Sequence, residues 1–299
     1  MLLFTYIPGF VYNSKEPSYT FPALADSIIQ GGKIFAYKGR SHLGMEHDGE
    51  LGIILDIKSE LNEETSYKSV ERIKNLICLS YTNIPMCRWE TVDEEIDQFI
   101  ESNLASKFYN PEIRFGNQLD WDLPLRIAAY VQLIHKLPPE KQTKFWQALQ
   151  TYCHAREIAH LPNPQYRYTL YMTLHLASIN QLADEPHSVH EKEVKLICPE
   201  CEEVSALSHS TSHVQEMAKL INDLIDEPYS QTWVSLMKKL YHPVRSQYIH
   251  TGKLAGFEDA GGFIALWKNK QALMEYDINL MILNRQLLER YLQVIAEQH

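Results

Sequence analysis

The sequence predicts an α+β protein in which a small β-rich amino-terminal module precedes a predominantly α-helical bundle. Up to about residue 88, short segments rich in β-branched and aromatic residues are separated by Gly, Pro, Ser and Asn, a pattern typical of strands. From Thr91 onward, apolar residues recur at the spacing of amphipathic helices. A chain of 299 residues with 45% hydrophobic and 22% charged residues can fold as one large domain or two modest ones.

The amino-terminal module is expected to cover residues 1–88. Its glycine-containing segment 38–49 is expected to form an exposed loop between two strands. The expected strands are short and rich in β-branched or aromatic residues, and they are Leu2–Ile7, Phe10–Tyr12, Lys33–Tyr37, Leu51–Ile57 and Leu76–Tyr81.

Residues 89–138 are expected to form connecting helices. Thr91 and Glu94 have the spacing of a capping box, in which the two side chains satisfy early helix amides. The apolar residues that follow fall on one helical face, and they are Val92, Ile96, Phe99, Ile100 and Leu104.

Residues 139–299 are expected to form the helical bundle, with a Cys/His loop insertion over residues 184–213. Pro124 and Pro139 stand where helices can begin, because proline fits the first helical turn. Apolar residues at helical spacing predict further helices over residues 164–183, 214–224, 233–240 and about 267–296.

Composition limits the possible functions. The 28 Lys and Arg residues against 38 Asp and Glu give a net charge of −10, so any contact with nucleic acid must be local. The five cysteines are scattered and odd in number, which argues against a disulfide framework and favours a reducing, cytoplasmic compartment. No apolar run is long enough to cross a membrane, and the amino terminus lacks the pattern of a signal peptide. We therefore expect a soluble protein without a membrane partner.

The most informative segment is residues 238–253. The chain has no acidic residue between Glu227 and Glu258, although the whole protein is acidic. The cations of this segment are Lys238, Lys239, Arg245 and Lys253, and the aromatic residues interleaved with them are Trp233, Tyr241 and Tyr248. Such a segment suits contact with phosphates and bases, the alternative being a solvated face beside a helix end.

Arg245 and His250 give this segment a chemical capability. On an α-helix their separation corresponds to about 140° of rotation and roughly 7.5 Å of rise, which long side chains can bridge. A guanidinium binds phosphate as a planar fork, and an imidazole can give or take a proton near neutral pH. The pair suits cleavage of RNA by its own 2′-hydroxyl, which needs an acid, a base and charge neutralisation but no metal. The second proton carrier would come from a symmetric dimer or from His242.

The string Leu240-Tyr-His-Pro-Val-Arg-Ser-Gln-Tyr-Ile-His-Thr-Gly252 resembles the signature of HEPN domains, specifically of their Apea-like branch. Arg245 and His250 match the family's Arg and His with four residues between them, and Thr251 is a small departure before the glycine. The resemblance is strongest over residues 230–256 and extends by helix count over 139–299. It implies a HEPN-like helical bundle, usually dimeric and often a metal-independent ribonuclease of toxin or antiviral defence systems, although some members only bind.

We therefore interpret the chain as a metal-independent endoribonuclease of HEPN type, acting as a homodimer on RNA. Arg245 would neutralise the scissile phosphate, and His250 would act as general acid or base. The residues expected to assist in binding the substrate are Ser246, Tyr248, Lys238, Lys239, His242 and Lys253. The alternatives are a non-catalytic HEPN-like protein that binds nucleic acid or nucleotides as a sensor, and a zinc-stabilised scaffold without a ligand pocket.

A second motif, Cys198-Pro-Glu-Cys201, has the spacing with which two thiolates bind one tetrahedral zinc ion. His209 and His213 would complete the ligand set, with His187 and His190 as upstream alternatives. The competing interpretation is two free thiols in a polar loop. We expect no cofactor for catalysis, and zinc would be structural.

Overall fold

The computed structural model describes most of the chain as two compact units. The units are Met1–Gln142 with Ile295–His299, and Thr143–Val294. The described residues are 1–12, 14–23, 29–40, 46–58, 63–80, 89–106, 123–158, 164–185, 188–197, 204–210, 212–227, 229–251 and 270–297. The predicted order, a β-rich part followed by a largely helical part, is confirmed, and the fold class is α+β.

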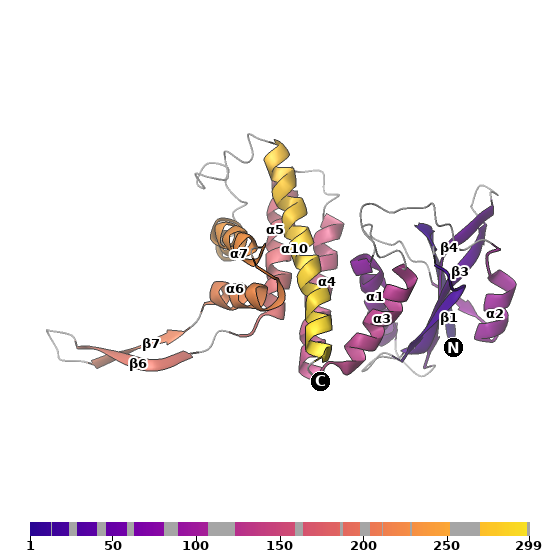
Figure 1. Ribbon diagram of the computed structural model, residues 1–299, viewed down its shortest axis with the longest axis horizontal. Coiled ribbons are helices and arrows are strands. Elements are labelled where there is room, and N and C mark those ends of the chain that lie inside the picture. Colours follow the sequence, from indigo (N-terminus) through magenta and orange to yellow (C-terminus); the bar gives the residue numbers. More distant parts are fainter. Residues whose placement is uncertain are drawn as a thin grey trace. The chain divides into compact units, whose positions relative to one another are not determined.

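The amino-terminal unit is built on a five-stranded antiparallel sheet (Figure 1). Its strands are β1 (Leu2–Val11), β2 (Ser18–Pro22), β3 (Ile29–Arg40), β4 (Glu46–Ile57) and β5 (Glu90–Val92). The strand order is β2-β3-β4-β1-β5, so the long β4 pairs with β3 on one side and with β1 on the other. The sheet therefore has an apolar central strand buried between two neighbours.

One face of the sheet carries an aromatic cluster covered by α2 (Ile96–Asn103). Phe4, Phe35 and Ile54 come from three adjacent strands and share this face, because alternate residues of a strand point to the same side. The ring centroid of Phe99 on α2 lies 4.8 Å from that of Phe4. The predicted apolar face of this helix is thus the face that packs on the sheet.

Gly52 of β4 makes room for this cluster. A Cβ atom at Gly52 would lie 2.9 Å from both Phe35 Cζ and Tyr37 Cβ, closer than carbon atoms approach in folded proteins. The absence of a side chain at Gly52 therefore leaves space for Phe35 and Tyr37 of the neighbouring strand β3.

The opposite face of the sheet is covered by α1 (Glu63–Ser80) and α3 (Leu123–Lys136) (Figure 1). α3 contacts β2 and β3, and α1 packs against α3. The expected strand at Leu76–Tyr81 is wrong, because the described part of this segment ends α1. Ile73 and the residues from Leu76 to Leu79 are all buried, and a short run that is apolar on every side does not distinguish a buried strand from a buried helix.

Two expected strand boundaries are also wrong. β1 continues through Pro8 as one strand, with a shift in register between Ile7 and Val11, so Phe10–Tyr12 is not a separate strand. The expected loop 38–49 is largely the ends of β3 and β4, which pair as far as Arg40. Pairing between strands extends each of them beyond the point where local composition favours a turn.

The expected capping box at Thr91 and Glu94 is wrong. Thr91 lies in β5, where it is paired with Leu3 of β1, and α2 begins five residues later at Ile96. Glu95 is the N-cap residue, and it makes no side-chain capping hydrogen bond. The backbone of β5 pairs with β1 in the sheet, and this pairing outweighs the local preference of Thr91 for a helix start.

The second unit is a helical bundle that carries a two-stranded hairpin (Figure 1). Its helices are α4 (Pro139–Ile158), which it contains from Thr143, then α5 (Pro164–Leu182), α6 (His213–Leu224), α7 (Tyr229–Leu240), the π-helical turn η1 (Tyr241–Ser246), α8 (Gln247–Thr251) and α10 (Lys270–Glu297). α4, α5 and α10 run side by side, and α6 packs against both α5 and α7. The helices predicted in this region are confirmed. None of the helices in the described ranges is long and apolar enough to cross a membrane.

The hairpin is formed by β6 (Ser188–Ile197) and β7 (Val204–Ser210), which pair in antiparallel register. Both strands lie within the expected Cys/His loop insertion at 184–213, so these described residues are not an irregular loop, and residues 186–187, 198–203 and 211 lie outside the described residues. Helix α6 then starts with a capping box in which Ser212 and Gln215 exchange side-chain hydrogen bonds with each other's amides.

Buried cysteines occur in both units. Cys78 on α1 is 2% exposed, and Cys153 on α4 is 3% exposed. Both therefore pack as small apolar side chains within helices.

Candidate functional site

The candidate site lies on one continuous helical segment that changes its winding. α7 passes directly into η1 and then into α8, and η1 packs against α5. Pro243 within η1 has no amide hydrogen, so it cannot donate the hydrogen bond that an α-helix requires at this position. π-helical turns of this kind occur frequently at functional sites.

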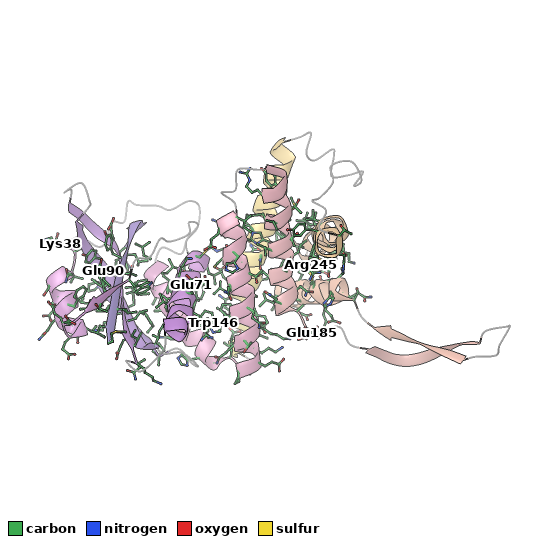
Figure 2. The ribbon with its side chains drawn as sticks, turned by 180° about the vertical axis from the view of Figure 1, so that it is seen from behind. Lys38, Glu71, Glu90, Trp146, Glu185 and Arg245 are labelled. Atoms are coloured by element: carbon green, nitrogen blue, oxygen red, sulfur yellow. The ribbon has the colours of Figure 1, made fainter. Side chains whose placement is uncertain are left out.

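Arg245 is held within this turn by Tyr241. Its Nη1 atom donates a hydrogen bond of 2.6 Å to the Tyr241 hydroxyl oxygen, and its Cζ atom lies 4.9 Å from the centroid of the Tyr241 ring. Tyr241 is buried, so it forms a fixed support, whereas Arg245 is half-buried. Figure 2 shows Arg245 beside the helices of the second unit.

The rest of the guanidinium has unused hydrogen-bonding capacity. Its Nε atom is buried and has no hydrogen-bond partner among the described residues. Within the same described ranges, no carboxylate forms an ion pair with Arg245. An arginine that is positioned by a neutral phenol and not neutralised by a carboxylate is suited to bind an anion such as phosphate.

The other predicted site residues lie along the same segment. His250 is exposed and lies in the last turn of α8. Ser246 and Tyr248 are half-buried between Arg245 and His250, and Lys238 is exposed on α7. The side chains of Lys239 and His242, and all of Lys253, lie outside the described part of the chain.

A buried polar network lies among α4, α5 and α10 of the bundle. The Ser178 hydroxyl donates to the Ala148 carbonyl at 2.7 Å and lies 3.1 Å from Asn284 Oδ1. Asn284 Nδ2 donates to His175 Nδ1 at 3.1 Å and to the His175 carbonyl oxygen at 3.3 Å. The network therefore joins the Ala148 main-chain carbonyl of α4 to side chains of α5 and α10.

His175 is the ionisable member of this network. Burial, with a smaller contribution from the positive charge of Arg156, lowers the pKa of His175 to about 3. Because Nδ1 accepts a hydrogen bond from Asn284, the proton of the neutral ring is assigned to Nε2. That Nε2 atom has no partner among the described residues, and the rings of Tyr152 and Tyr171 pack edge-on against the imidazole.

The predicted zinc ligands are only partly described. Cys198 and Cys201 lie outside the described residues, between the ends of β6 and β7. His209 pairs with Val189, so it lies five residues from Val204, or about 17 Å along the strand. His213 is exposed in the first turn of α6. Among the described residues, no group of three or more potential ligands is placed to hold a metal ion.

Sequence reasoning assigned no role to three features of this unit. The sequence presents Tyr241 only as one of the aromatic residues interleaved with the cations, although its spacing of four residues from Arg245 is the signal that identifies the contact. His175 and Asn284 are separated by 109 residues, so no local pattern links them. A pocket between α7 and α10 is likewise formed by residues that are distant in sequence.

The chain matches no family model, no curated protein and no solved structure.

Proposed function

We propose that the protein is a metal-independent endoribonuclease whose site is formed by Arg245 and His250. The observation that carries the proposal is the state of Arg245, which is fixed by Tyr241 and has no carboxylate partner among the described residues. An exposed imidazole follows on the same continuous helix. A positioned cation and a proton carrier are the minimum that phosphodiester transesterification needs.

The proposed reaction proceeds by transfer within the RNA. His250 accepts the proton of the 2′-hydroxyl, and the 2′-oxygen attacks the adjacent phosphorus. Arg245 stabilises the negative charge that develops on the phosphoryl oxygens. The bond from phosphorus to the 5′-oxygen breaks, and a second imidazole gives that oxygen its proton. The products are a 2′,3′-cyclic phosphate and a free 5′-hydroxyl.

The second imidazole comes from a homodimer in this proposal. One His250 per chain cannot easily be both the base and the acid of a single turnover, and two-fold symmetry supplies a second copy. A monomer by light scattering that retains full activity would instead transfer the acid role to His242. A dimer that loses activity on dilution, in parallel with dissociation, would support the composite site.

The test is cleavage of single-stranded RNA and of DNA of the same sequence, with chelator present. We expect RNA alone to be cut, with 2′,3′-cyclic phosphate products. Arg245→Ala and His250→Ala should each lower kcat by about 10²–10⁴-fold. His154→Ala is the matched control, since His154 is also exposed on a helix of this unit. Undiminished cleavage by the double Ala variant would show that the site lies elsewhere.

Arg245→Lys tests how the phosphate is bound. Lysine keeps the positive charge but loses the planar fork and its hydrogen bond to Tyr241. A large defect would indicate bidentate contact, whereas near-normal activity would mean that charge alone is needed. Binding of RNA without any cleavage by the wild-type protein would favour the non-catalytic sensor.

Zinc remains a separate structural prediction. The register of β6 and β7 gives no support for bringing His209 to the cysteine-containing end of the hairpin. About one zinc per chain in protein never exposed to chelator, lost in Cys198→Ser, would establish a metal site involving that cysteine. A zinc content far below one per chain would remove the prediction.

A further inference from the structure

The second unit contains an open pocket at the end of α7 opposite to Arg245. It has a volume of about 650 Å³ and lies between the junction of α6 with α7 on one side and α10 on the other. Figure 1 shows α7 beside α10 in this unit. The volume falls within the range of sites that accommodate a small molecule or one nucleotide.

One wall of the pocket is aromatic. Tyr229 and Trp233 are four residues apart on α7, so their side chains lie on the same helical face. Tyr229 is 69% exposed and Trp233 is half-buried. Two accessible aromatic rings on one helical face form a surface on which a flat ring can stack.

The opposite wall is polar. Gln286, Arg290 and Gln293 recur at helical spacing on α10, and all three are exposed. Asp226 adds a carboxylate from the α6–α7 junction. In the described part of the chain, none of these four side chains has a hydrogen-bond or ion-pair partner.

The charges of the lining argue against a polyphosphate. Arg290 is a single cation, whereas Asp226 and Glu289 are carboxylates, and Glu289 accepts a hydrogen bond from Arg285 at 3.2 Å. A ligand that is flat, nearly neutral and rich in edge donors and acceptors fits this lining better. A nucleobase has those properties.

Guanine has the edge groups that this lining best complements. Its N7 and O6 atoms can accept a bidentate pair of hydrogen bonds from an arginine such as Arg290. Its N1 and N2 hydrogens can donate to a carboxylate such as Asp226. The side-chain amide of Gln286 or of Gln293 on α10 can serve as donor or acceptor.

The pocket has a fixed relation to Arg245. α7, η1 and α8 follow one another without a break, and Trp233 precedes Arg245 by twelve residues, or roughly 18 Å of helix. We propose that this pocket binds one unstacked guanine of single-stranded RNA, a few nucleotides from the bond that is cut at Arg245. The cleavage position is the part that rests on the proposed ribonuclease function. Recognition of the base does not depend on it.

The binding test uses short single-stranded oligonucleotides whose 2′-hydroxyls are methylated, because they cannot be cleaved. One oligonucleotide contains a single guanine in a uridine run, and matched ones carry adenine, cytosine or uracil there. Wild-type protein should bind the guanine version most tightly. Tyr229→Ala should weaken binding about 5- to 150-fold, the measured range for loss of one stacking partner.

Two further variants keep the result interpretable. Trp233→Phe retains a ring in the partly buried position, so it should fold and show a smaller loss of affinity than Tyr229→Ala. Thr232→Ala is the matched control, because Thr232 is exposed on α7 outside the pocket. Equal affinity of wild type, Tyr229→Ala and Trp233→Phe for all four oligonucleotides would overturn the pocket proposal.

The cleavage test separates the two proposals. With ordinary RNA, wild type should cut at a constant distance from a guanine, and Tyr229→Ala should lose that preference. Guanine-selective binding without cleavage would leave the pocket proposal standing and overturn the ribonuclease. Cleavage whose position ignores guanine in both proteins would overturn the proposed spacing between the pocket and Arg245 and leave the ribonuclease standing.

Discussion

The two units of the molecule differ in what they bury. The sheet unit packs aromatic and aliphatic side chains in the cluster around Phe4 and Phe35. The bundle instead buries the network of His175, Ser178 and Asn284. Among the described residues, the buried side-chain atoms without a hydrogen-bond partner all belong to the bundle, including His175 Nε2 and Arg245 Nε.

The difference shows which unit contains buried groups that lower the stability of the fold. An unpaired buried polar atom destabilises a fold by about 1–3 kcal/mol, whereas an apolar cluster only stabilises it. The unit that carries the proposed site is also the one that retains such atoms. Both cores are mostly apolar, and among the described residues the bundle differs by retaining buried polar atoms without a hydrogen-bond partner.

The largest expected stability effect tests the apolar side of this comparison. Phe35→Ala removes a fully buried ring from the aromatic cluster and should lower the free energy of unfolding by about 3–5 kcal/mol. Phe35→Leu is the matched control and should cost less, because it fills more of the cavity. Urea unfolding followed by circular dichroism measures both. Equal, small losses would mean that the cluster is loosely packed.

The second effect concerns pH and the buried imidazole. The folded state keeps His175 neutral down to a pKa of about 3, whereas in the unfolded state its pKa is the ordinary 6.5. Below pH 6.5 the unfolded state therefore binds the extra proton, so this contribution to stability is complete above pH 6.5 and is lost as the pH falls. The slope should approach about 1.4 kcal/mol per pH unit.

The measurement is urea unfolding of wild type and His175→Gln between neutral pH and pH 4. Other titrating groups affect both proteins alike, so the difference between the two curves isolates His175. A constant difference across this range would show that His175 is not buried as a neutral group.

The third effect tests the hydrogen-bonded side of the comparison. Asn284→Ala removes the groups that join His175 to Ser178, and it should cost about 1–3 kcal/mol because their partners stay buried. Asn284→Leu fills the volume again but forms no hydrogen bonds, so it should be no more stable than Asn284→Ala. If Asn284→Leu instead stabilises the protein, the network is dispensable for the fold and its retention needs a functional reason.

The smallest effect on stability is expected at Tyr241. Tyr241→Phe keeps the ring beneath Arg245 but removes the hydroxyl that accepts its hydrogen bond, so the free energy of unfolding should fall by only about 0.5–1.5 kcal/mol. The positioning role predicts a lower kcat with little change in KM. A variant with reduced stability and unchanged kcat would limit Tyr241 to packing.

The same contrast explains how far sequence reasoning succeeds. Helix starts at Pro139 and Pro164 are confirmed, because proline and apolar spacing act within a few residues of each other. The sheet is less predictable, since β1 continues through Pro8 and Thr91 joins a strand only because each meets a distant partner. Pairing over such separations leaves no local signal.

The candidate site likewise has a local part that the sequence predicts and a part, formed by residues far apart in the chain, that it does not. The spacing of Tyr241, Arg245 and His250 is local, so the sequence places them on one helical segment, although not the π-helical turn or the hydrogen bond to Tyr241. The pocket is lined by Asp226 at the junction of α6 with α7 and by Arg290 on α10, which are far apart in the chain. Only the packing of α7 against α10 makes them neighbours.

The buried cysteines give each unit a chemical reporter of its own. A thiol reagent can modify Cys78 only when α1 opens, and Cys153 only when α4 opens, since both side chains are almost fully covered. With the remaining cysteines replaced by serine, the labelling rates at these two positions would measure the opening free energies of the sheet and of the bundle separately. One variant with two cysteines would thus report which of the two units opens more readily.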